Sequence, residues 1–99
     1  MLPRHRITTH PGEVLAEEFL KPLDLSANAL AIALRVPAIR ITAIINGQRS
    51  ITADTALRLA RYFGTTAEFW INLQGFYDLS RVKAEYGETI AREVATRPA

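Results

Sequence analysis

The sequence predicts an all-α fold, and three observations carry that prediction. Apolar residues recur at helical spacing, with capping residues beside them, about six times along the chain. No stretch alternates apolar and polar residues as a half-buried strand requires. The 99 residues are 48% apolar, which suffices for a single hydrophobic core. We therefore expect one domain built from helices alone.

The first two predicted helices are bounded by proline and serine residues. The first begins near Pro11-Gly12, and Pro22 ends it because proline cannot continue the backbone hydrogen bonds. Ser26 is a good N-cap for the second helix, which ends near residues 35–36. The residues expected to form its apolar stripe are Ala29, Leu30, Ala33 and Leu34.

The third and fourth predicted helices both close at a glycine. Pro37 fixes φ at the first position of the third helix, which ends at Asn46-Gly47. Thr52 caps the fourth helix, and Gly64 ends it. The residues expected to face inward are Ile41, Ile44 and Ile45 in the third helix, and Leu57, Ala60 and Phe63 in the fourth.

The fifth predicted helix carries most of the aromatic residues. Thr65 or Thr66 opens it, and it extends as far as Tyr86, where Gly87 ends it. A last short helix is expected over residues 88–95.

Positive charge is concentrated in the middle of the chain. The net charge is only +2, yet residues 25–65 contain five arginines and one acid, a local balance of 5 − 1 = +4. Residues 1–24 and residues 66–99 each have one more acid than base. Because arginine forms paired hydrogen bonds with phosphates and guanine edges, this middle segment favours a nucleic-acid partner, although a GC-rich gene would also favour arginine.

The composition argues against several other classes of protein. There is no cysteine, and His5 and His10 are not spaced as a metal-binding pair, so we expect no metal and no cofactor. No serine occupies a nucleophile elbow and no glycine-rich loop follows a strand, which argues against an enzyme. No apolar run resembles a secretory signal or a membrane span of about 20 residues, so we expect a cytoplasmic protein without a membrane partner.

Residues 26–47 have the form of a helix-turn-helix, in which two short helices are joined by a tight turn. This geometry places the second helix in a major groove of DNA. Ala31 is small where the helices cross, Val36 fills the turn, and Ile41 and Ile44 anchor the second helix to the core. An ordinary helical hairpin without a ligand is the alternative.

Helical geometry decides which side chains of this motif can touch DNA. Successive residues turn by about 100°, so Ile39, Thr42, Ala43 and Asn46 lie opposite the inward isoleucines. Arg40 lies at the edge of this face, and we expect Arg40 and Thr42 to be the principal readers of bases. Ile39 either meets a thymine methyl group or is an isolated surface aliphatic residue. The residues expected to contact phosphates are Ser26, Asn46, Gln48 and Arg49.

Five of the eight aromatic residues lie between Phe69 and Tyr86, in the fifth predicted helix. A protein that reads two half-sites needs a twofold dimer, and such interfaces favour aromatic residues. Core packing is the alternative for about half of them. The residues expected at a homodimer interface are Phe69, Trp70, Leu73, Phe76 and Tyr77, with Tyr86 further along the chain.

Four segments closely resemble the HigA antitoxin family, a branch of the Xre-type helix-turn-helix group. They read HPGEVL over residues 10–15, RITAIINGQR over 40–49, ITADTALRLA over 51–60 and FWINLQ over 69–74. The resemblance spans residues 7–80. It implies a five-helix domain of the Xre and lambda-repressor type, dimerisation on a palindromic operator, repression of the protein's own operon, and neutralisation of a RelE-like mRNA-cleaving toxin, HigB.

The sequence departs from that family pattern at three places. Arg35 stands where the wider group often has glycine, so it must accept a left-handed or distorted turn at a cost of about 1 kcal/mol. Ala38, Ile39 and Ala43 occupy positions that are often polar base readers, which shifts base readout towards Arg40, Thr42 and DNA shape. Gly75 lies within the fifth helix, where it weakens the helix unless it serves a kink or a close helix crossing.

These observations predict an N-terminal arm over residues 1–10, a helix-turn-helix domain over 11–80 and a helical extension over 81–99. Arg4 and Arg6 either form a basic arm or belong to a frayed end. A dimeric operon repressor with a toxin partner is the leading functional hypothesis. Two alternatives remain: a protein whose main task is to inhibit a partner protein, and a solitary Xre-type regulator without a toxin.

Overall fold

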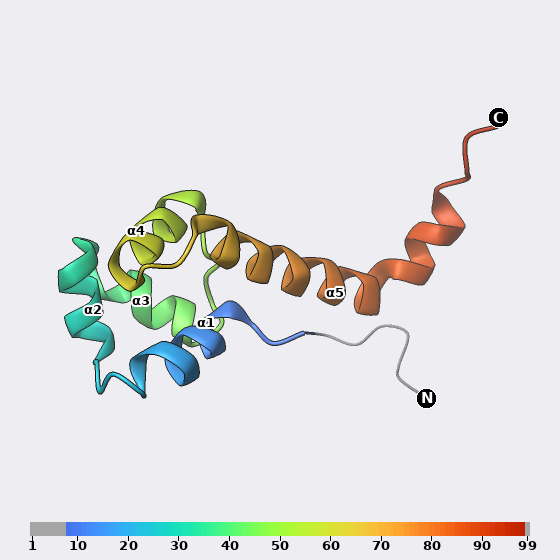
Figure 1. The fold of residues 1–99 in the computed structure, drawn as a ribbon. Coiled ribbons are helices and arrows are strands. Elements are labelled where there is room, and N and C mark those ends of the chain that lie inside the picture. Colours follow the sequence, from blue (N-terminus) through green and yellow to red (C-terminus); the bar gives the residue numbers. More distant parts are fainter. Residues whose placement is uncertain (1–7, 99) are drawn as a thin grey trace.

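The computed structural model describes residues 8–98, and this part of the chain consists of helices and loops without a strand (Figure 1). The helical elements are α1 (Pro11–Val14), the π-helical η1 (Leu15–Leu20), α2 (Ala27–Leu34), α3 (Ala38–Ile45), α4 (Ala53–Phe63) and α5 (Ala67–Glu93). Because α1 passes into η1 without a break, five helical segments are present in the described residues. The all-α prediction is confirmed.

Side-chain caps begin three of these helices. The Ser26 hydroxyl accepts a hydrogen bond from the Ala29 N–H at 3.0 Å, and the Thr66 hydroxyl accepts one from the Phe69 N–H at 3.1 Å. His10 caps α1, since its Nδ1 accepts from the Gly12 N–H at 2.9 Å. Such bonds satisfy backbone donors that have no partner within the helix. The predicted caps at Ser26 and Thr66 are confirmed.

Two boundary predictions require correction. Pro37 is the N-cap of α3 and not its first helical residue, with extended backbone at φ −61° and ψ 143°. Thr52 also occupies an N-cap position, but its hydroxyl makes no capping bond to the α4 backbone. The π-helical turn of η1, marked by the hydrogen bond from the Lys21 N–H to the Ala16 carbonyl, was not predicted because apolar spacing does not distinguish it from an α-turn.

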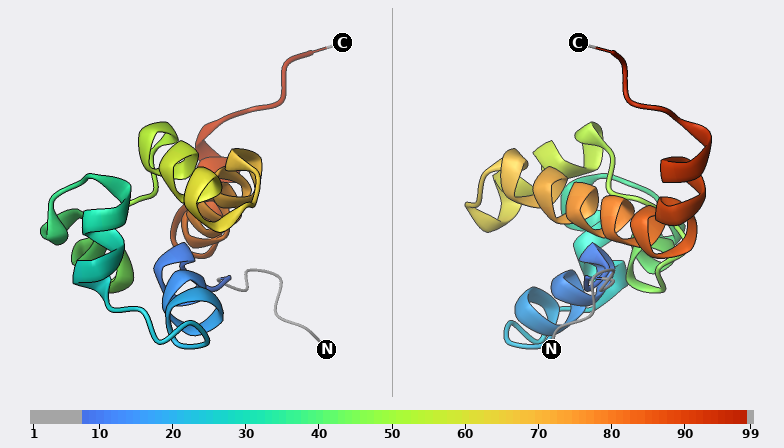
Figure 2. Two further views of the ribbon diagram at one scale, coloured as in Figure 1. Left: turned by 60° about the vertical axis from the view of Figure 1, so that its left-hand side comes forward. Right: turned by 90° about the vertical axis from the view of Figure 1, so that its right-hand side faces the viewer.

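The hydrophobic core lies where α1, η1, α2, α3, α4 and the first half of α5 meet (Figure 2). Phe19, Phe63 and Trp70 pack together at its edge, with the Phe19 ring centre 4.9 Å from each of the other two. The fully or almost fully buried apolar side chains are Leu15, Leu20, Leu30, Ala31, Leu34, Ile41, Ile44, Ile51, Ala56, Leu59 and Trp70.

The inward faces of α2 and α4 are as predicted for Leu30, Leu34, Ala60 and Phe63, which lie in or against the core, but two predicted residues point outward. In α4, Leu57 is 63% exposed, while Ala56 and Leu59 are buried. In α2, Ala33 is exposed, while Ala31 is buried, as expected for the small residue where the helices cross. Helix α2 is apolar on nearly all sides, so helical periodicity alone allows more than one rotation about its axis, whereas α4 is amphipathic and Leu57 is an apolar residue on its outer side. Packing against the neighbouring helices selects the rotation.

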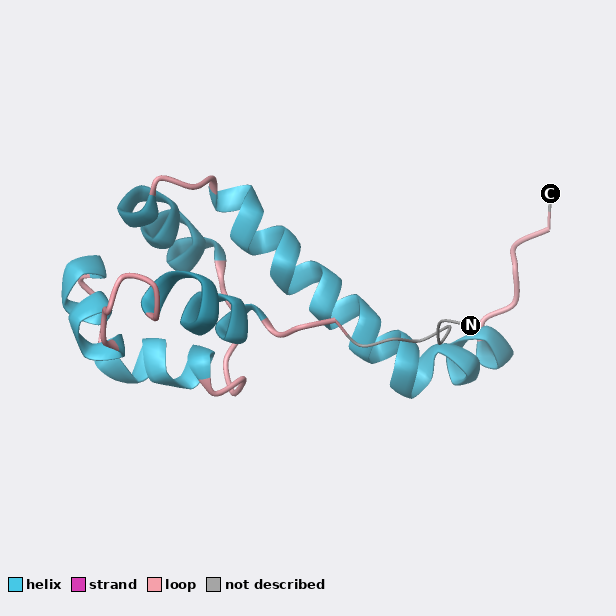
Figure 3. Cartoon of the chain, turned by 60° about the horizontal axis from the view of Figure 1, so that its bottom comes forward, coloured by secondary structure: helices cyan, strands magenta, loops and turns pink. Residues whose placement is uncertain are grey.

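Helix α5 is longer than predicted. It continues through Gly87 to Glu93 as one helix of 27 residues, so no separate helix covers residues 88–95. Glycine within a helix costs only about 1 kcal/mol, and there is no proline between residues 67 and 93 to end it. Figures 1 and 3 show α5 projecting beyond the other helices, with its axis turning near the end.

Candidate nucleic-acid interface

Arg35 makes the turn between α2 and α3. It has the left-handed conformation, with φ 62° and ψ 43°. The Arg35 N–H donates to the Ile32 carbonyl at 3.2 Å, and the Val36 N–H donates to the Ala31 carbonyl at 3.0 Å. This is the hydrogen-bond pattern of a Schellman motif, in which glycine is usual. Of the left-handed or distorted turn expected at Arg35, the structure shows the left-handed form, and Val36 packs against the core as predicted.

Helix α3 has one buried side and one open side. Ile41 and Ile44 are completely buried, and Ile45 is partly buried. On the other side, Ile39 is 72% exposed and Thr42 is exposed, so no other element covers this face within the described chain. The Thr42 hydroxyl lies 3.3 Å from the carbonyls of the preceding turn, which leaves its lone pairs free to accept a hydrogen bond.

The C-terminal end of α3 is closed tightly. Gly47 has φ 74°, its N–H donates to the Ile44 carbonyl at 3.0 Å, and the Gln48 N–H donates to the Ala43 carbonyl at 2.8 Å. These bonds form a second Schellman motif, which confirms the predicted helix end at Asn46-Gly47.

Gly12 brings α1 into direct backbone contact with this end of α3. A Cβ atom on Gly12 would collide with the carbonyl oxygen of Ile44. Glycine is therefore required at this position for α1 to support α3. This explains the glycine within the HPGEVL segment.

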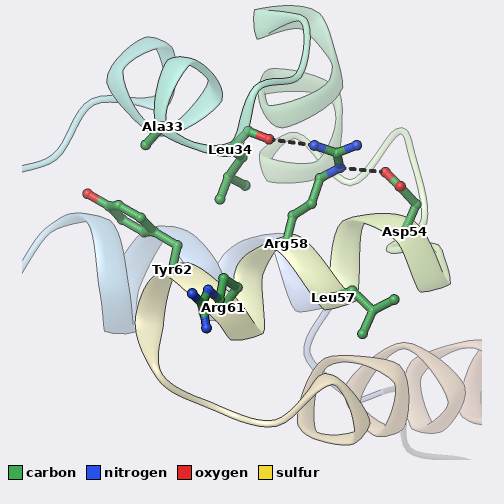
Figure 4. A pocket seen from close by; sticks show the side chains of 7 residues that line it. All are labelled: Ala33, Leu34, Asp54, Leu57, Arg58, Arg61 and Tyr62. Atoms are coloured by element: carbon green, nitrogen blue, oxygen red, sulfur yellow. Dashed lines mark hydrogen bonds and ion pairs between the residues drawn. The ribbon is translucent and has the colours of Figure 1, made fainter.

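Arg40 is held against α4 by Asp54. Its Nη1 donates to Asp54 Oδ2 at 2.8 Å, and its side chain is only 24% exposed. Arg58 Nε donates to the same oxygen at 2.9 Å, and Arg58 Nη1 donates to the Leu34 carbonyl at 2.9 Å (Figure 4). These two arginine contacts lower the pKa of Asp54 below its ordinary value, with the Arg58 hydrogen bond as the largest cause. We call this network the Asp54 clamp.

The Asp54 clamp connects all the parts of the helix-turn-helix. It joins the last turn of α2 through Leu34, the middle of α3 through Arg40, and the first turns of α4 through Asp54 and Arg58. In the free protein, Arg40 therefore positions α3 and does not extend from its open face. Sequence reasoning missed Asp54 and Arg58; their spacing of four residues, which favours an ion pair on one helix face, was the available signal.

Gln74 fixes the loop that follows α3. Its buried Oε1 accepts a hydrogen bond from the Ile51 N–H at 2.8 Å, and its Nε2 donates to Asp78 Oδ1 at 2.9 Å. Gln74 was also missed, although a polar residue four positions after Trp70, on the inner face of a helix, is a sign of a buried hydrogen bond.

The residues predicted to contact phosphates are exposed around α3. Ser26 lies at the start of α2, Asn46 caps the end of α3, and Gln48 and Arg49 follow in the loop. Two further arginines, Arg35 and Arg61, are exposed as well. Ala38 and Ile39 are exposed in the first turn of α3, and Ala43 is partly covered.

The predicted dimer-interface residues differ in burial. Trp70 is completely buried, and its Nε1 donates to the Thr65 hydroxyl at 2.8 Å, so it belongs to the core and cannot form an interface. Leu73 packs against the core. The Tyr77 ring meets the His10 ring edge-on, with 4.8 Å between the ring centres. Phe69 and Phe76 remain accessible. Phe69/Phe76 and Trp70/Tyr77 are each seven residues apart in α5, and the core covers part of the side on which they lie.

Other candidate sites receive little support from the described residues. Within residues 8–98, no three histidine or acidic side chains are grouped as a metal site would require. None of the helices in this part of the chain has the length and apolar character needed to cross a membrane. Arg4, His5 and Arg6 lie outside the described residues.

Comparison with known proteins places this geometry in a family. The sequence profile of the helix-turn-helix family matches residues 17–70. The chain is 58% identical over 76 residues to virulence-associated protein I of Dichelobacter nodosus, which covers 77% of this chain and 70% of that protein.

Several solved structures are similar to this chain in both fold and sequence. An addiction module antidote protein of the HigA family from Coxiella burnetii has 53% identity and a TM-score of 0.87, covering 93% of this chain and all of that one. The antitoxin HigA of Pseudomonas aeruginosa, solved with the higBA promoter, has 47% identity and a TM-score of 0.87, covering 91% of this chain and 98% of that one. This chain therefore belongs to the helix-turn-helix family, in its HigA-type branch.

Proposed function

We propose that this chain is an antitoxin that binds operator DNA as a dimer and represses its own operon. The observation that carries the proposal is the open face of α3, with Ile39 and Thr42 exposed between two Schellman turns. A rigid helix with one uncovered side is what major-groove recognition requires. The HigA relative solved with a promoter makes DNA the expected ligand of this face. Operon repression would take place in the cytoplasm.

Two groups of residues make different contacts with the DNA, one to the bases and one to the phosphates. Thr42 can bond a base edge, and the exposed methyl groups of Ile39 can contact a thymine methyl. Ala38 and Ala43 allow α3 to lie close to the base edges, and Arg40 is the reader at the border of this face, once it is released from Asp54. Contacts to phosphates set the position of the helix without reading sequence, and they come from Ser26, Asn46, Gln48 and Arg49.

The operator test uses the DNA upstream of the protein's own reading frame, with fluorescence anisotropy at fixed salt. Thr42→Ala and Ile39→Ala should each weaken specific binding by about 1–3 kcal/mol while affinity for a scrambled duplex stays the same. Arg49→Ala should weaken binding to both duplexes and reduce the salt slope by about one.

The matched control is Glu88→Ala, an exposed substitution to the same residue on the projecting part of α5. It should leave both affinities unchanged. If Thr42→Ala and Ile39→Ala behave like Glu88→Ala, with helical content intact by circular dichroism, α3 is not the reading helix and the proposal fails.

We also propose a toxin partner of the RelE-like class, which the HigA relationship supports. Co-expression with the neighbouring short reading frame, followed by affinity purification of either product, should recover a complex and restore growth that the toxin alone arrests. If no such gene or complex exists while operator binding persists, the chain is a solitary Xre-type regulator. Loss of DNA binding with retention of the complex would make partner inhibition its main task.

A further inference from the structure

A groove lies between α2 and α4, beside the helix-turn-helix (Figure 4). Its volume is about 570 Å³. Small-molecule sites have volumes of roughly 300–1,000 Å³, so the groove has the size of a ligand site. Ala33 and Leu34 line it from α2, and side chains between Asp54 and Tyr62 line it from α4. No residue of α3 lines this groove, so it is separate from the proposed base-reading face.

The walls of the groove are more apolar than polar. Leu57 and Tyr62 are both exposed there, although they are among the largest apolar side chains of α4. Figure 4 shows the Tyr62 side chain extending from α4 in the direction of Ala33 on α2. An exposed aliphatic and an exposed aromatic side chain in one concave surface favour a ligand with an apolar body.

Two arginines supply the charge of the groove. Arg58 and Arg61 are three residues apart on α4, the spacing that places side chains on the same side of a helix. Arg58 uses Nε for Asp54 and Nη1 for the Leu34 carbonyl, while its Nη2 donates to no other residue within 8–98. Arg61 forms no ion pair with any residue of this described part. The groove therefore has unused cationic donors beside its apolar walls.

This combination selects the chemistry of the ligand. Guanidinium groups bind carboxylates through paired, charge-assisted hydrogen bonds. A cation would be repelled by the two arginines, and inorganic phosphate has no apolar part to cover Leu57 and Tyr62. An aromatic or aliphatic acid satisfies both features of the groove.

We propose that the groove between α2 and α4 binds a small organic acid. Its carboxylate pairs with Arg61 and the free Nη2 of Arg58, and its apolar body lies against Leu57 and Tyr62.

Occupancy of the groove should lower the affinity for operator DNA, a consequence that rests on the proposed function. The groove shares Arg58 with the Asp54 clamp, which holds Arg40 of α3. A bound acid therefore brings a negative charge beside the clamp and into the basic segment of the chain. Protein–DNA affinity depends on positive charge near the phosphates, so this addition opposes binding.

The binding experiment uses the full-length chain without DNA and 3-phenylpropionate as the probe. Titration followed by nitrogen-15 NMR should shift the amide signals of Ala33, Leu57 and Arg61, with a dissociation constant of about 1–5 mM for a ligand of this size. The neutral 3-phenylpropanamide has the same shape and should bind at least about fivefold more weakly.

Arg61→Gln tests the cation that is free in the groove. This exposed substitution should preserve the helical content and weaken 3-phenylpropionate binding by at least about fivefold. Arg92→Gln, the same change at an exposed position near the end of α5, is the matched control and should leave the dissociation constant unchanged.

The operator experiment repeats the anisotropy titration with 3-phenylpropionate near saturation, at constant sodium concentration. Operator affinity of the wild type should fall by about two- to fivefold relative to the same titration with the amide, and Arg61→Gln should reduce this effect. Unchanged operator affinity with the acid bound would refute the link to DNA binding.

Three results would overturn the site itself. Equal binding of the acid and the amide would remove the role of the arginines, as would equal binding by Arg61→Gln and the wild type. Signal shifts confined to residues outside the groove would place the ligand elsewhere. If the probe does not bind and Arg61→Gln weakens binding to operator and scrambled duplex alike, the groove contacts DNA phosphates instead. Because probe binding is measured without DNA, a failure of operator recognition is recognised separately.

Discussion

Arg35 carries a conformational cost that glycine at the same position would avoid. A residue with a Cβ atom at φ 62° is strained by roughly 1 kcal/mol. We expect Arg35→Gly to raise the free energy of unfolding by up to about 0.5 kcal/mol, because the strain it relieves is only partly offset by the entropy that glycine adds to the unfolded chain. Urea denaturation followed by circular dichroism measures this change.

Arg35→Ala is the control for this prediction, because alanine removes the charge but keeps the Cβ atom. It should not stabilise the protein. Equal stabilisation by glycine and alanine would show that repulsion between arginines, and not backbone strain, is the cost at this position.

Asp54 determines whether α3 is held in one orientation. In Asp54→Asn, the two arginine contacts lose their charged acceptor. We expect the ratio of operator affinity to scrambled-duplex affinity to fall by about three- to tenfold, since specific binding needs α3 aligned and the loss of this alignment outweighs the easier release of Arg40. Anisotropy titrations on the two duplexes give the ratio. Asp24→Asn, which removes an exposed carboxylate outside the clamp, should leave the ratio unchanged.

At the scale of the elements, α1 supports α3 through a single backbone contact. Gly12→Ala should lower the free energy of unfolding by about 2–4 kcal/mol, because the new Cβ atom collides with backbone that cannot move aside. Thermal or urea unfolding tests this. Gly75→Ala introduces the same change into open space and should stabilise the monomer slightly, so similar losses in both variants would contradict the contact at Ile44.

The cap of α1 makes its stability depend on pH. Burial lowers the pKa of His10 below its ordinary 6.5, while Asp78 acts in the opposite direction. Only neutral His10 can accept from the Gly12 N–H through Nδ1. Its contribution to stability is therefore fully present above pH 6.5 and is lost as the pH falls through the lowered pKa.

We expect acidification from about pH 7.5 to about pH 5 to cost about 0.5–1 kcal/mol at this cap, after allowance for partial solvent screening. Urea unfolding at the two pH values measures the loss. His10→Asn keeps a capping side chain that does not titrate, so this variant should lose less stability over the same range. An equal loss in the variant and the wild type would place the pH dependence elsewhere.

At the scale of the whole molecule, the two halves of α5 have different roles. Its first half completes the core through Trp70 and fixes the loop after α3 through Gln74, whereas residues beyond Arg81 bury nothing in the same chain. A chain ending at Arg81 should therefore keep its helical fold and lose only about 1 kcal/mol of monomer stability, the scale of fraying. Circular dichroism and urea unfolding at low concentration test this. Loss of cooperative unfolding would mean that the projecting half supports the body.

The sequence predicted elements far better than it predicted their rotation or their partners. Caps and left-handed turns are local, so Ser26, Thr66, Gly47 and Gly64 marked helix ends correctly. The rotation of α4 and the burial of Trp70 depend on which neighbour a helix meets, so helical periodicity placed Ala60 and Phe63 correctly, turned Leu57 inward wrongly and left the burial of Trp70 undecided. The residues of the DNA-contacting face remain predictions.

By itself, the sequence determined the helix-turn-helix and the open side of α3, because each depends on capping and spacing within about twenty residues, while the turn at Arg35 was implied by the family resemblance. Only the tertiary structure decided that Arg40 is held by Asp54, that Gly12 lies against Ile44 and that a groove with two arginines lies between α2 and α4. Those features depend on how separate helices pack, and the free energy that selects them comes from packing and not from local propensity.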